Sequence, residues 1–393
     1  MPDWRETRTE TMLQHLGEGT HVYGAAVPPI FQNSTFIFET WDGFREAMEA
    51  QFDLPTPRDK CNYSRINNPS LDLVGEKLAA LEKTECGRFF ASGMAAITTG
   101  IMTCVKAGAH VVCVDTCYGP TRNFFSEYLP RFGVETSFVI GTDPQEVIDA
   151  IRPETTLIYL ESPGSIVFKL QDLEAICTEA RKRGIRTAID NSYSTPIYQN
   201  PADFGVDIVL HTATKFLGGH SDIVAGGLAT SKAIMQEIMA NEAQYFGSAL
   251  GPFQSWLILR SMRTLPLRVK QHTENATEVA RWLRERPEVR EVHYCGFDDF
   301  PQRELFQKQM RAASSLVCFE TVFQDEPTLR KFTEALRVYR LGVSWGGHES
   351  LVVALPFKPM DWQEERWLIR LHCGLEHVDD MKADLDQAFA LVR

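Results

Sequence analysis

The sequence lacks an uninterrupted apolar run long enough to cross a membrane. Apolar stretches such as residues 95–105 are broken by Thr and Gly and fall short of the roughly 18 residues that a spanning helix needs. Residues 1–6 carry charges of both signs and no apolar run, so we expect no signal peptide. The 393 residues include 40 Lys and Arg against 52 Asp and Glu, a formal charge of −12. This acidic balance argues against nucleic acid or an anionic membrane as the main partner.

The sequence also lacks paired cysteines and the short motifs of several enzyme classes. Its nine cysteines are scattered without a C-x-x-C, so we expect reduced thiols in a cytoplasmic protein. There is no G-x-G-x-x-G after a strand, no G-x-x-x-x-G-K-[ST], no G-x-S-x-G and no H-E-x-x-H. Hydride transfer, nucleotide hydrolysis and zinc chemistry therefore have no support, and we predict no metal site.

The composition is that of a folded protein. With 44% hydrophobic and 23% charged residues, the chain can bury enough apolar surface to offset its conformational entropy. Its length predicts two or three domains. Residues 1–60 contain several prolines and little periodicity, which predicts an irregular arm with one helix near residues 41–51. An arm of this length must lie on its own core or on a neighbouring subunit.

From residue 61 onward, short β-branched and apolar runs alternate with helical stretches. We expect strands at 111–114, 136–140, 156–160, 186–189, 207–210 and 228–230, with helices such as 121–132, 145–151 and 170–183 between them. This alternation predicts an α/β domain with a mostly parallel sheet. Ligands bind outside the carboxyl ends of such strands, so residues that follow a strand are candidates for chemistry.

After about residue 255 the pattern changes to a smaller α+β type. We expect a long helix at 268–286, strands at 289–294, 315–321, 350–355 and 367–373, and helices at 327–338 and 378–392. The predicted division of the chain is therefore an arm over residues 1–60, a large α/β domain over 61–255 and a small C-terminal domain over 256–393.

Three features of the large domain suggest chemistry. Lys215 follows the strand predicted at 207–210, where burial would lower the pKa of its ammonium and make the amine nucleophilic. Asp190 ends the strand predicted at 186–189. The small residues at 91–96 open a helix whose free N–H groups can hold an anion. Taken singly, each has a structural explanation: a lysine reaching from the sheet edge to solvent, an aspartate that caps a turn, and an ordinary helix start.

Together the three features suit pyridoxal 5′-phosphate (PLP). A strand-end lysine can bind this cofactor covalently, and a strand-end carboxylate can keep its pyridine nitrogen protonated. The helix start can hold the phosphate. The order of the three along the chain agrees with this interpretation.

Seven stretches of the sequence follow one another in an order typical of one enzyme family. They are Tyr-Ser-Arg at 63–65 followed by Asn-Pro at 68–69, Ser-Gly-Met at 92–94, Tyr-Gly-Pro at 118–120, Glu-Ser-Pro at 161–163, Asp-Asn-Ser at 190–192, Thr-Lys at 214–215 with Gly-His-Ser-Asp at 219–222, and Arg-Leu-His at 370–372. With them the chain resembles, from about residue 20 to its end, the cysteine/methionine-metabolism (trans-sulfuration) family of PLP-dependent enzymes. The resemblance implies an aspartate-aminotransferase-like PLP fold (fold type I) in which residues 61–255 bind PLP.

The resemblance also implies a role for each matching residue at the cofactor. Lys215 matches the lysine that holds the cofactor and later moves protons, and Asp190 matches the partner of the pyridine nitrogen. Tyr118 matches an aromatic ring stacked on the cofactor. The resemblance implies three catalytic residues, which are Lys215, Tyr118 and Tyr63. The residues that match the phosphate-binding groups are Gly93, Met94, Thr212 and Thr214 and, from the neighbouring subunit, Tyr63 and Arg65.

On the substrate side, Arg370 matches the residue that binds the α-carboxylate with its planar guanidinium, beside Ser344. At Trp345 the sequence resembles bacterial cystathionine β-lyase, the branch of the family that it resembles most. At Val343 the sequence instead resembles methionine γ-lyase. His348 stands at a position where the β-lyase has a tyrosine. Because these residues line the distal substrate pocket in the family, both β- and γ-elimination stay open.

We therefore expect a PLP-dependent carbon–sulfur lyase, first a cystathionine β-lyase that forms homocysteine, pyruvate and ammonia. The alternative is a γ-lyase acting on methionine or on an oxygen-linked analogue such as canavanine. A third, catalytically silent PLP-binding regulator is disfavoured by the intact Lys215, Asp190 and Arg370. The expected partners are a small amino-acid substrate and further copies of the chain, in a homotetramer built from dimers that share active sites.

Overall fold

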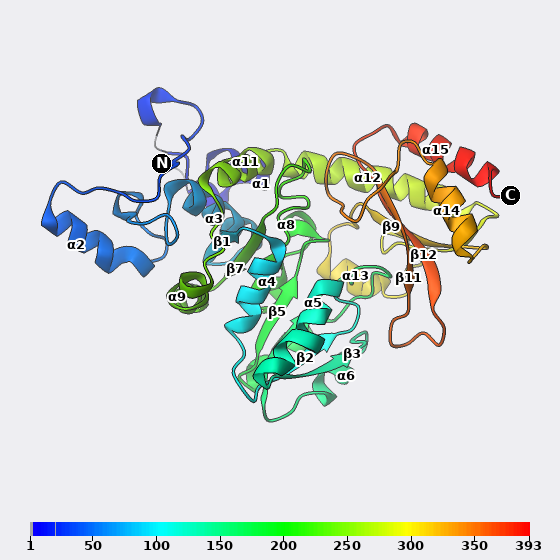
Figure 1. Ribbon diagram of the computed structural model, residues 1–393, viewed down its shortest axis with the longest axis horizontal. Coiled ribbons are helices and arrows are strands. Elements are labelled where there is room, and N and C mark those ends of the chain that lie inside the picture. Colours follow the sequence, from blue (N-terminus) through cyan, green and yellow to red (C-terminus); the bar gives the residue numbers. More distant parts are fainter. Residues whose placement is uncertain (1–2, 20) are drawn as a thin grey trace.

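The computed structural model describes residues 3–19 and 21–393 and contains two β-sheets. A seven-stranded sheet lies in the middle of the molecule, a five-stranded sheet lies near the C-terminus, and the arm extends on the opposite side (Figure 1). The predicted α/β fold with a smaller C-terminal α+β part is confirmed. The domain boundaries at residues 60 and 255 stay a prediction, and residues 1, 2 and 20 of the predicted arm lie outside the described residues.

The large sheet has the strand order β1-β7-β6-β5-β4-β2-β3. Its strands are β1 (Cys86–Phe90), β2 (His110–Val114), β3 (Glu135–Val139), β4 (Thr155–Leu160), β5 (Arg186–Asp190), β6 (Ile208–His211) and β7 (Gly226–Thr230). β2 to β6 run parallel, whereas β7 is antiparallel to both of its neighbours. β1 is antiparallel to β7, as β6 is, so it runs in the same direction as β2 to β6. The carboxyl ends of six strands therefore meet at one edge of the sheet, the edge at which ligands bind in this architecture.

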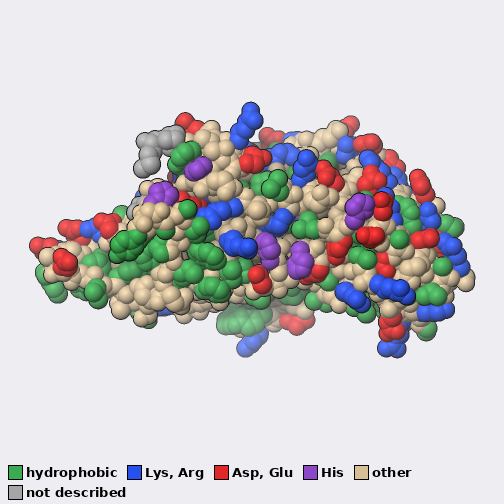
Figure 2. All heavy atoms as spheres, turned by 90° about the horizontal axis from the view of Figure 1, so that it is seen from above, with side chains coloured by type: hydrophobic (Ala, Val, Ile, Leu, Met, Phe, Trp, Pro, Cys, Tyr) green, Lys and Arg blue, Asp and Glu red, His purple; other side chains and the backbone are tan. Residues whose placement is uncertain are grey.

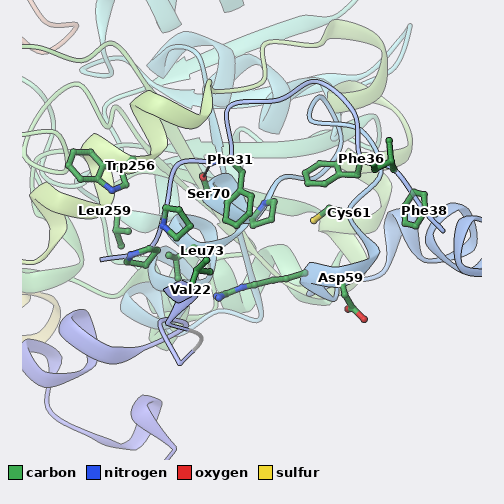
Figure 3. Close-up of a pocket in the computed structure, with 15 residues that line it drawn as sticks. Val22, Phe31, Phe36, Phe38, Asp59, Cys61, Ser70, Leu73, Trp256 and Leu259 are labelled. Carbon is green, nitrogen blue, oxygen red and sulfur yellow. Dashed lines mark hydrogen bonds between the residues drawn. The ribbon is translucent and has the colours of Figure 1, made fainter. Parts of the chain in front are cut away.

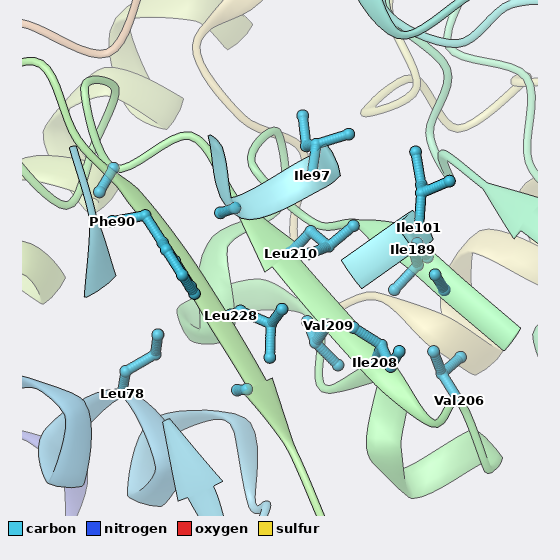
Figure 4. Packing of buried hydrophobic residues seen from close by; sticks show 14 of the residues in the cluster. Leu78, Phe90, Ile97, Ile101, Ile189, Val206, Ile208, Val209, Leu210 and Leu228 are labelled. Atoms are coloured by element: carbon cyan, nitrogen blue, oxygen red, sulfur yellow. The ribbon is translucent and has the colours of Figure 1, made fainter. Parts of the chain in front are cut away.

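Helices cover the large sheet and bury their apolar stripes against it. They are α3 (Pro69–Glu82), α4 (Gly93–Met102), α5 (Gly119–Asn123), α6 (Pro144–Asp149), α7 (Leu173–Lys182), α8 (Thr195–Tyr198), α9 (Lys232–Ala240), α10 (Glu242–Phe246) and α11 (Pro252–Met262). α4 lies close to the sheet because Gly100 has no side chain: an added Cβ would be 3.1 Å from Leu210. Ile97 and Ile101 of the same helix belong to the buried core that also contains Leu210 of β6 and Ile189 of β5 (Figure 4).

The small sheet has the order β10-β11-β12-β9-β8. Its strands are β8 (Val289–His293), β9 (Leu316–Thr321), β10 (Arg340–Leu341), β11 (Leu351–Phe357) and β12 (Arg366–His372), and the helices of this part are α12 (Leu265–Arg284), α13 (Arg303–Gln309), α14 (Glu326–Ala335) and α15 (Val378–Ala390). Phe389 of α15 joins its core, with its ring centroid 4.6 Å from Phe332 and 6.3 Å from Phe319. Across the described chain, no helix combines the length and apolar character needed to span a membrane.

The arm contains more regular structure than its sequence predicts. Besides α2 (Trp41–Glu49), the expected helix, it forms α1 (Thr9–His15). A buried ion-pair network fixes α1: the ammonium of Lys77 on α3 donates to the Leu13 carbonyl at 2.7 Å and lies 2.9 Å from Glu18. Arg263 binds the same Glu18 carboxylate at 2.6 Å. Long-range contacts of this kind, which leave no periodic signal, explain why the prediction missed α1.

An apolar pocket of about 360 Å³ lies where the arm meets α3 and α11. Phe31 and Phe36 of the arm line it together with Leu73 of α3 and Trp256 of α11 (Figure 3). The arm therefore covers the large domain only in part and leaves apolar surface between the two.

The sequence also failed to predict β1. This strand contains Gly87 and Arg88, which are untypical of a buried strand. Gly87 is required because an added Cβ would lie 2.4 Å from the carbonyl of Gly75 on α3. The buried Arg88 donates to the carbonyls of Ile66 and Arg65 at 2.8 and 2.9 Å. The close approach of α3 accounts for Gly87, and the backbone carbonyls of the loop before α3 account for Arg88.

Candidate active site

The sheet edge brings together the two strand-end residues predicted to carry chemistry. Asp190 is the last residue of β5 and pairs with Leu210 on the adjacent β6. Lys215 lies four residues beyond the end of β6. The turns after the two strands are joined, because the Thr212 N–H donates to Ser192 Oγ at 2.6 Å.

Lys215 is half-buried between the two parts of the chain. Its ammonium donates a hydrogen bond to Ser344 Oγ at 2.7 Å, and Nζ lies 5.3 Å from the ring centroid of Trp345. Burial, followed by the nearby Arg370 charge, lowers the pKa of Lys215 to about 8, although Asp190 opposes the shift. A larger fraction of neutral amine is thus present near neutral pH than for an exposed lysine, as a nucleophile or a base requires.

Asp190 is a buried carboxylate, 6% exposed. Burial raises its pKa, while the Ser192 N–H, which donates to Oδ1 at 2.9 Å, and the charges of His211 and Lys215 act in the opposite direction. Tyr118 lies near Asp190 and Arg370, and burial of its phenol raises the pKa of that group. Asp190 therefore interacts electrostatically with both the Lys215 amine and the Tyr118 phenol.

The start of α4 lies against Thr212, in the turn between β6 and Lys215. Ser92 caps the helix, since its hydroxyl accepts from the Ala95 N–H at 3.0 Å. The first N–H groups of a helix have no intrahelical acceptor, so those of Gly93 and Met94 can serve an anion. An added Cβ at Gly93 would lie 2.4 Å from Thr212 Oγ1, which brings the Thr212 hydroxyl against the same helix start.

Thr214 is also predicted to bind phosphate, but its hydroxyl already forms hydrogen bonds to the backbone. Its hydroxyl accepts from the Ala225 N–H at 3.0 Å and donates to the Ala225 carbonyl at 3.2 Å. A phosphate oxygen could bind Thr214 only by competing for this hydroxyl proton. Thr212 is thus better placed than Thr214 to serve the anion.

The residues predicted to bind the substrate lie on β12 of the small sheet and on the loop between β10 and β11. Arg370 on β12 donates from Nη2 to the Val343 carbonyl at 2.8 Å, and burial lowers the pKa of its guanidinium. The loop that follows Val343 lies against the Lys215 turn at Gly346, where φ is +83° and an added Cβ would lie 2.7 Å from the Phe216 nitrogen. Val343, Ser344 and Trp345 are therefore held between Arg370 and Lys215.

Tyr63 and Arg65 are not joined to this site by polar contacts within the described chain. Tyr63 is 47% exposed. Arg65 donates to the Gln244 carbonyl at 2.6 Å and lies 5.6 Å from the Tyr63 ring centroid. Their expected role from a neighbouring subunit stays a prediction.

The sequence analysis assigned no role to two buried acids near the site. Glu161 follows β4, accepts from the Tyr118 N–H at 2.7 Å and contacts the Ser165 hydroxyl. Burial and the charge of Asp190 raise its pKa to about 8. Its position after a strand is a signal that could have identified it. Glu82, at the end of α3, contacts His211, and no local sequence signal marks that pair.

Among the described residues, three side chains outside this site lie close enough together to bind a metal ion. Ligand atoms of Glu291, His293 and Glu320 lie within 4.8 Å of one another. Glu320 already accepts a hydrogen bond from Arg366 at 3.0 Å, and His293 Nε2 lies 3.6 Å from the same carboxylate oxygen. The Arg366 guanidinium thus already neutralises the Glu320 charge that a metal ion would otherwise balance. That the protein binds no metal stays a prediction.

Comparison with known proteins decides the family. The family model described as Cys/Met metabolism PLP-dependent enzyme matches residues 10–390. The chain belongs to this family. It is a PLP-dependent lyase, and the predictions of family, fold type, cofactor and enzyme class are confirmed.

The relatives of this enzyme include L-methionine gamma-lyases and cystathionine beta-lyases. The L-methionine gamma-lyase of Porphyromonas gingivalis is 38% identical over 388 residues, which cover 95% of each chain. The cystathionine beta-lyase MetC of Staphylococcus haemolyticus is 36% identical over 375 residues, 93% of this enzyme and 90% of that one. The crystal structure of metB from Corynebacterium glutamicum matches all of both chains with a TM-score of 0.89 and 29% identity. This enzyme is thus related to both kinds of lyase to nearly the same degree.

The residues at the sheet edge fit PLP chemically. A phosphate monoester needs N–H donors and hydroxyls, which the start of α4 and Thr212 offer in a space that an added Cβ would fill. A protonated pyridine nitrogen needs a buried anion, and Asp190 is one. An aldehyde needs an amine of lowered pKa, and Lys215 has one.

Proposed function

We propose that the enzyme catalyses β-elimination from a sulfur-substituted amino acid, with cystathionine as substrate, and releases homocysteine, pyruvate and ammonia. The observation that carries this proposal is the convergence of groups around Lys215. Asp190 comes from the large sheet and Arg370 from the small one, and both charges act on the lysine ammonium. An acid, a base and a carboxylate-binding guanidinium are the groups that such a reaction needs.

Each residue then has a role at the cofactor. Lys215 holds PLP between turnovers and, when free, takes the proton from the substrate Cα. Bound PLP supplies the electron sink for the electron pair left on that carbon. Asp190 keeps the pyridine nitrogen protonated, and Tyr118 stacks on the ring. The residues that hold the phosphate are Gly93, Met94, Thr212 and Thr214.

The substrate is held by its carboxylate. The guanidinium of Arg370 offers two parallel N–H donors to the α-carboxylate, and Ser344 assists from the adjacent loop. Ser344 accepts the hydrogen bond of Lys215, so the carboxylate site and the base are in contact through one hydroxyl. A substrate bound in this way would present its Cα–H bond to the lysine amine.

The choice of β over γ chemistry rests on Trp345. γ-Elimination needs a second proton removal, at Cβ, for which Lys215 is the available base. Its ammonium is confined between the Trp345 indole and the Ser344 hydroxyl, which favours one transfer at Cα. Val343 favours the second candidate, γ-elimination from methionine. Its apolar side chain is 83% exposed and would suit a thioether better than a charged distal group.

The keto acid identifies the reaction. β-Elimination of cystathionine yields pyruvate with homocysteine, whereas γ-elimination yields 2-oxobutyrate with cysteine. We expect pyruvate as the main product, and Lys215→Ala as the control should release neither acid. If 2-oxobutyrate is formed from every good substrate and pyruvate is absent, the β-lyase proposal is wrong. If the wild-type enzyme binds PLP but releases no keto acid from a panel of amino acids, it is a silent binding protein.

We also propose that two copies of the enzyme share their active sites and that two such dimers form a tetramer. Hydrophobic side chains gather over the arm, at the left of Figure 2. Tyr23, Ile37 and Trp41 of the arm are 72–105% exposed. A neighbouring subunit would bury them, and it would also receive Tyr63 and Arg65 at its cofactor phosphate.

Mixed dimers test the shared site. Subunits with Lys215→Ala and subunits with Arg65→Ala are each expected to be inactive alone. Hybrids of the two contain one active site with both residues intact, so we expect partial activity after mixing. Verified hybrids without activity would contradict the shared site, and a monomer in sedimentation would contradict the oligomer.

We propose a cytoplasmic location for the enzyme. All nine of its cysteines are buried and free of disulfide bonds, which suits a reducing compartment. Fractionation of cells that express the tagged chain would test this.

A further inference from the structure

His372, the last residue of the Arg-Leu-His stretch, has no assigned role but binds a loop of the candidate active site. It ends β12, two residues after Arg370, so the two side chains project from the same face of the strand. The His372 side chain is buried, since the residue is only 1% exposed. Its Nε2 accepts a hydrogen bond from the Gly346 N–H at 3.0 Å. A buried imidazole thus binds the backbone of the loop between β10 and β11.

The two ring nitrogens of His372 have different roles. Burial lowers the pKa of His372 well below its usual value of 6.5, and the nearby His272 acts in the same direction, so the ring is neutral and one nitrogen carries no proton. The Gly347 carbonyl lies 3.1 Å from Nε2, which cannot donate to it and accept from Gly346 at once. Gly346 is buried, and a buried N–H without an acceptor is rarer in proteins than a carbonyl without a donor. The proton therefore belongs on Nδ1, which lies 2.8 Å from Ser315 Oγ.

One face of β12 holds this loop at two points. Arg370 Nη2 donates to the Val343 carbonyl at 2.8 Å, and His372 Nε2 accepts from Gly346, three residues further along the chain. The two residues that contact the Lys215 ammonium lie between these anchors. Arg370 is also the proposed carboxylate-binding residue, so its guanidinium must serve the substrate as well as the loop. His372 is the anchor whose hydrogen bond serves the loop alone.

The bond to His372 also fixes how the loop meets the Lys215 turn. Gly346 has a φ of +83°, and an added Cβ there would lie 3.1 Å from Lys215 Cα and 2.7 Å from the Phe216 nitrogen. The two backbones therefore meet where only a glycine fits. A shift of Gly346 would move Ser344, two residues away, relative to the Lys215 amine that it binds at 2.7 Å.

We propose that His372 is a positioning residue: it holds the loop at Gly346 so that the Lys215 amine stays oriented toward the substrate Cα. The inference rests on the proposed function, in which Lys215 removes the Cα proton. Because the ring is buried, it acts through the loop. The competing explanation is that His372 only fills the core, where its ring meets that of Phe216 edge-on with centroids 6.4 Å apart. A residue that only fills the core would affect stability but not the rate of proton transfer.

Two substitutions of His372 separate these explanations. The amide of His372→Gln can take the place of Nε2 and keep the bond to Gly346, whereas the side chain of His372→Asn is one carbon shorter and loses it. His110→Asn is the matched control, because His110 is a buried histidine, 2% exposed, whose ring bonds to the hydroxyls of Thr155 and Ser137 at the start of β2. The full-length holoenzyme is assayed for kcat, for KM with cystathionine, for melting temperature and for hydrogen exchange of the Gly346 amide.

We expect His372→Asn to lower kcat roughly 10- to 100-fold, since a small displacement of a reacting group is enough for a loss of this size. KM should change less, because Arg370 stays paired with β11 and β9 on its two sides. The Gly346 amide of this variant should exchange roughly tenfold faster than that of the wild-type enzyme. His372→Gln should retain most of kcat and the slow exchange, and His110→Asn should leave both unchanged. If His372→Asn keeps the wild-type kcat, or if the two His372 variants lose it equally, the inference is wrong.

Failure of the proposed function gives a different result. If Lys215→Ala retains turnover, the role of Lys215 as the base is wrong and the inference falls with it, whereas a failed inference leaves that variant inactive. Should both His372 variants fail to fold, the ¹⁵N shifts of His372 in the wild-type enzyme replace them. A proton on Nδ1 and none on Nε2 would support the inference. A proton on Nε2 would overturn it, because the Gly346 N–H would then have no acceptor on the ring.

Discussion

Replacing Gly93 by Ala tests the proposed phosphate site. The new Cβ would lie 2.4 Å from Thr212 Oγ1, 2.8 Å from Thr212 Cγ2 and 3.0 Å from Thr212 Cβ, so the side chain or the helix start must move. Overpacking of this kind costs about 1–3 kcal/mol. If the displacement falls on the phosphate cradle, PLP binding should weaken by roughly 5- to 150-fold.

The assay is the dissociation constant of PLP from the full chain, with thermal unfolding measured in parallel. Gly119→Ala is the matched control: Gly119 also begins a helix, and an added Cβ there meets nothing within 4 Å. Thr212→Ala removes the two nearest atoms, so Gly93→Ala should cost much less in that background than alone. Wild-type affinity in Gly93→Ala, or an equal loss in both backgrounds, would refute the assignment of this helix start to the phosphate.

Three further predictions concern titratable side chains that are buried in part or in full. Lys215→Ala should abolish turnover with little change in melting temperature, and borohydride reduction of the wild-type enzyme should label Lys215; a label on another lysine would contradict the site. Lys77→Met removes one of the two cations that pair with Glu18 and should destabilise the enzyme by about 3–5 kcal/mol, with faster proteolysis of the arm; unchanged urea unfolding would contradict this. Burial lowers the pKa of His272 from 6.5 to about 4, so the unfolded chain binds a proton that the folded one refuses, and stability falls as the pH drops below 6.5. His272→Gln should therefore show a smaller loss of stability between about pH 7 and pH 5 than the wild-type enzyme.

The parallel part of the large sheet could be predicted because each strand is a short apolar run between helices. The strands expected at 111–114 and 186–189 are β2 and β5, which begin or end within one residue of the prediction. The helix expected at 121–132 continues beyond α5 as a π-helical turn and a 3-10 turn, because Pro130 has no N–H for a regular helix. Local pattern decides the existence of these elements, and tertiary packing adjusts their form.

The candidate site could be predicted in part for the same reason. Parallel strands end at one edge, so the sequence positions of Asp190 and Lys215 after adjacent strands already imply that they lie near each other. The contact between Lys215 and Ser344 spans 129 residues and depends on how the small sheet meets the large one. No periodicity in either segment contains that information.

The sequence by itself determined the fold class, the order of the chemical groups along the chain and the family resemblance, because these depend on local residue patterns and motif order. Only the tertiary structure decided which buried charges meet. Glu82 and His211 are 129 residues apart and belong to a helix and a strand whose patterns are ordinary. Their contact arises because α3 packs on the sheet beside β6, and a hydrogen bond across such an interface requires three-dimensional placement that neither segment encodes alone.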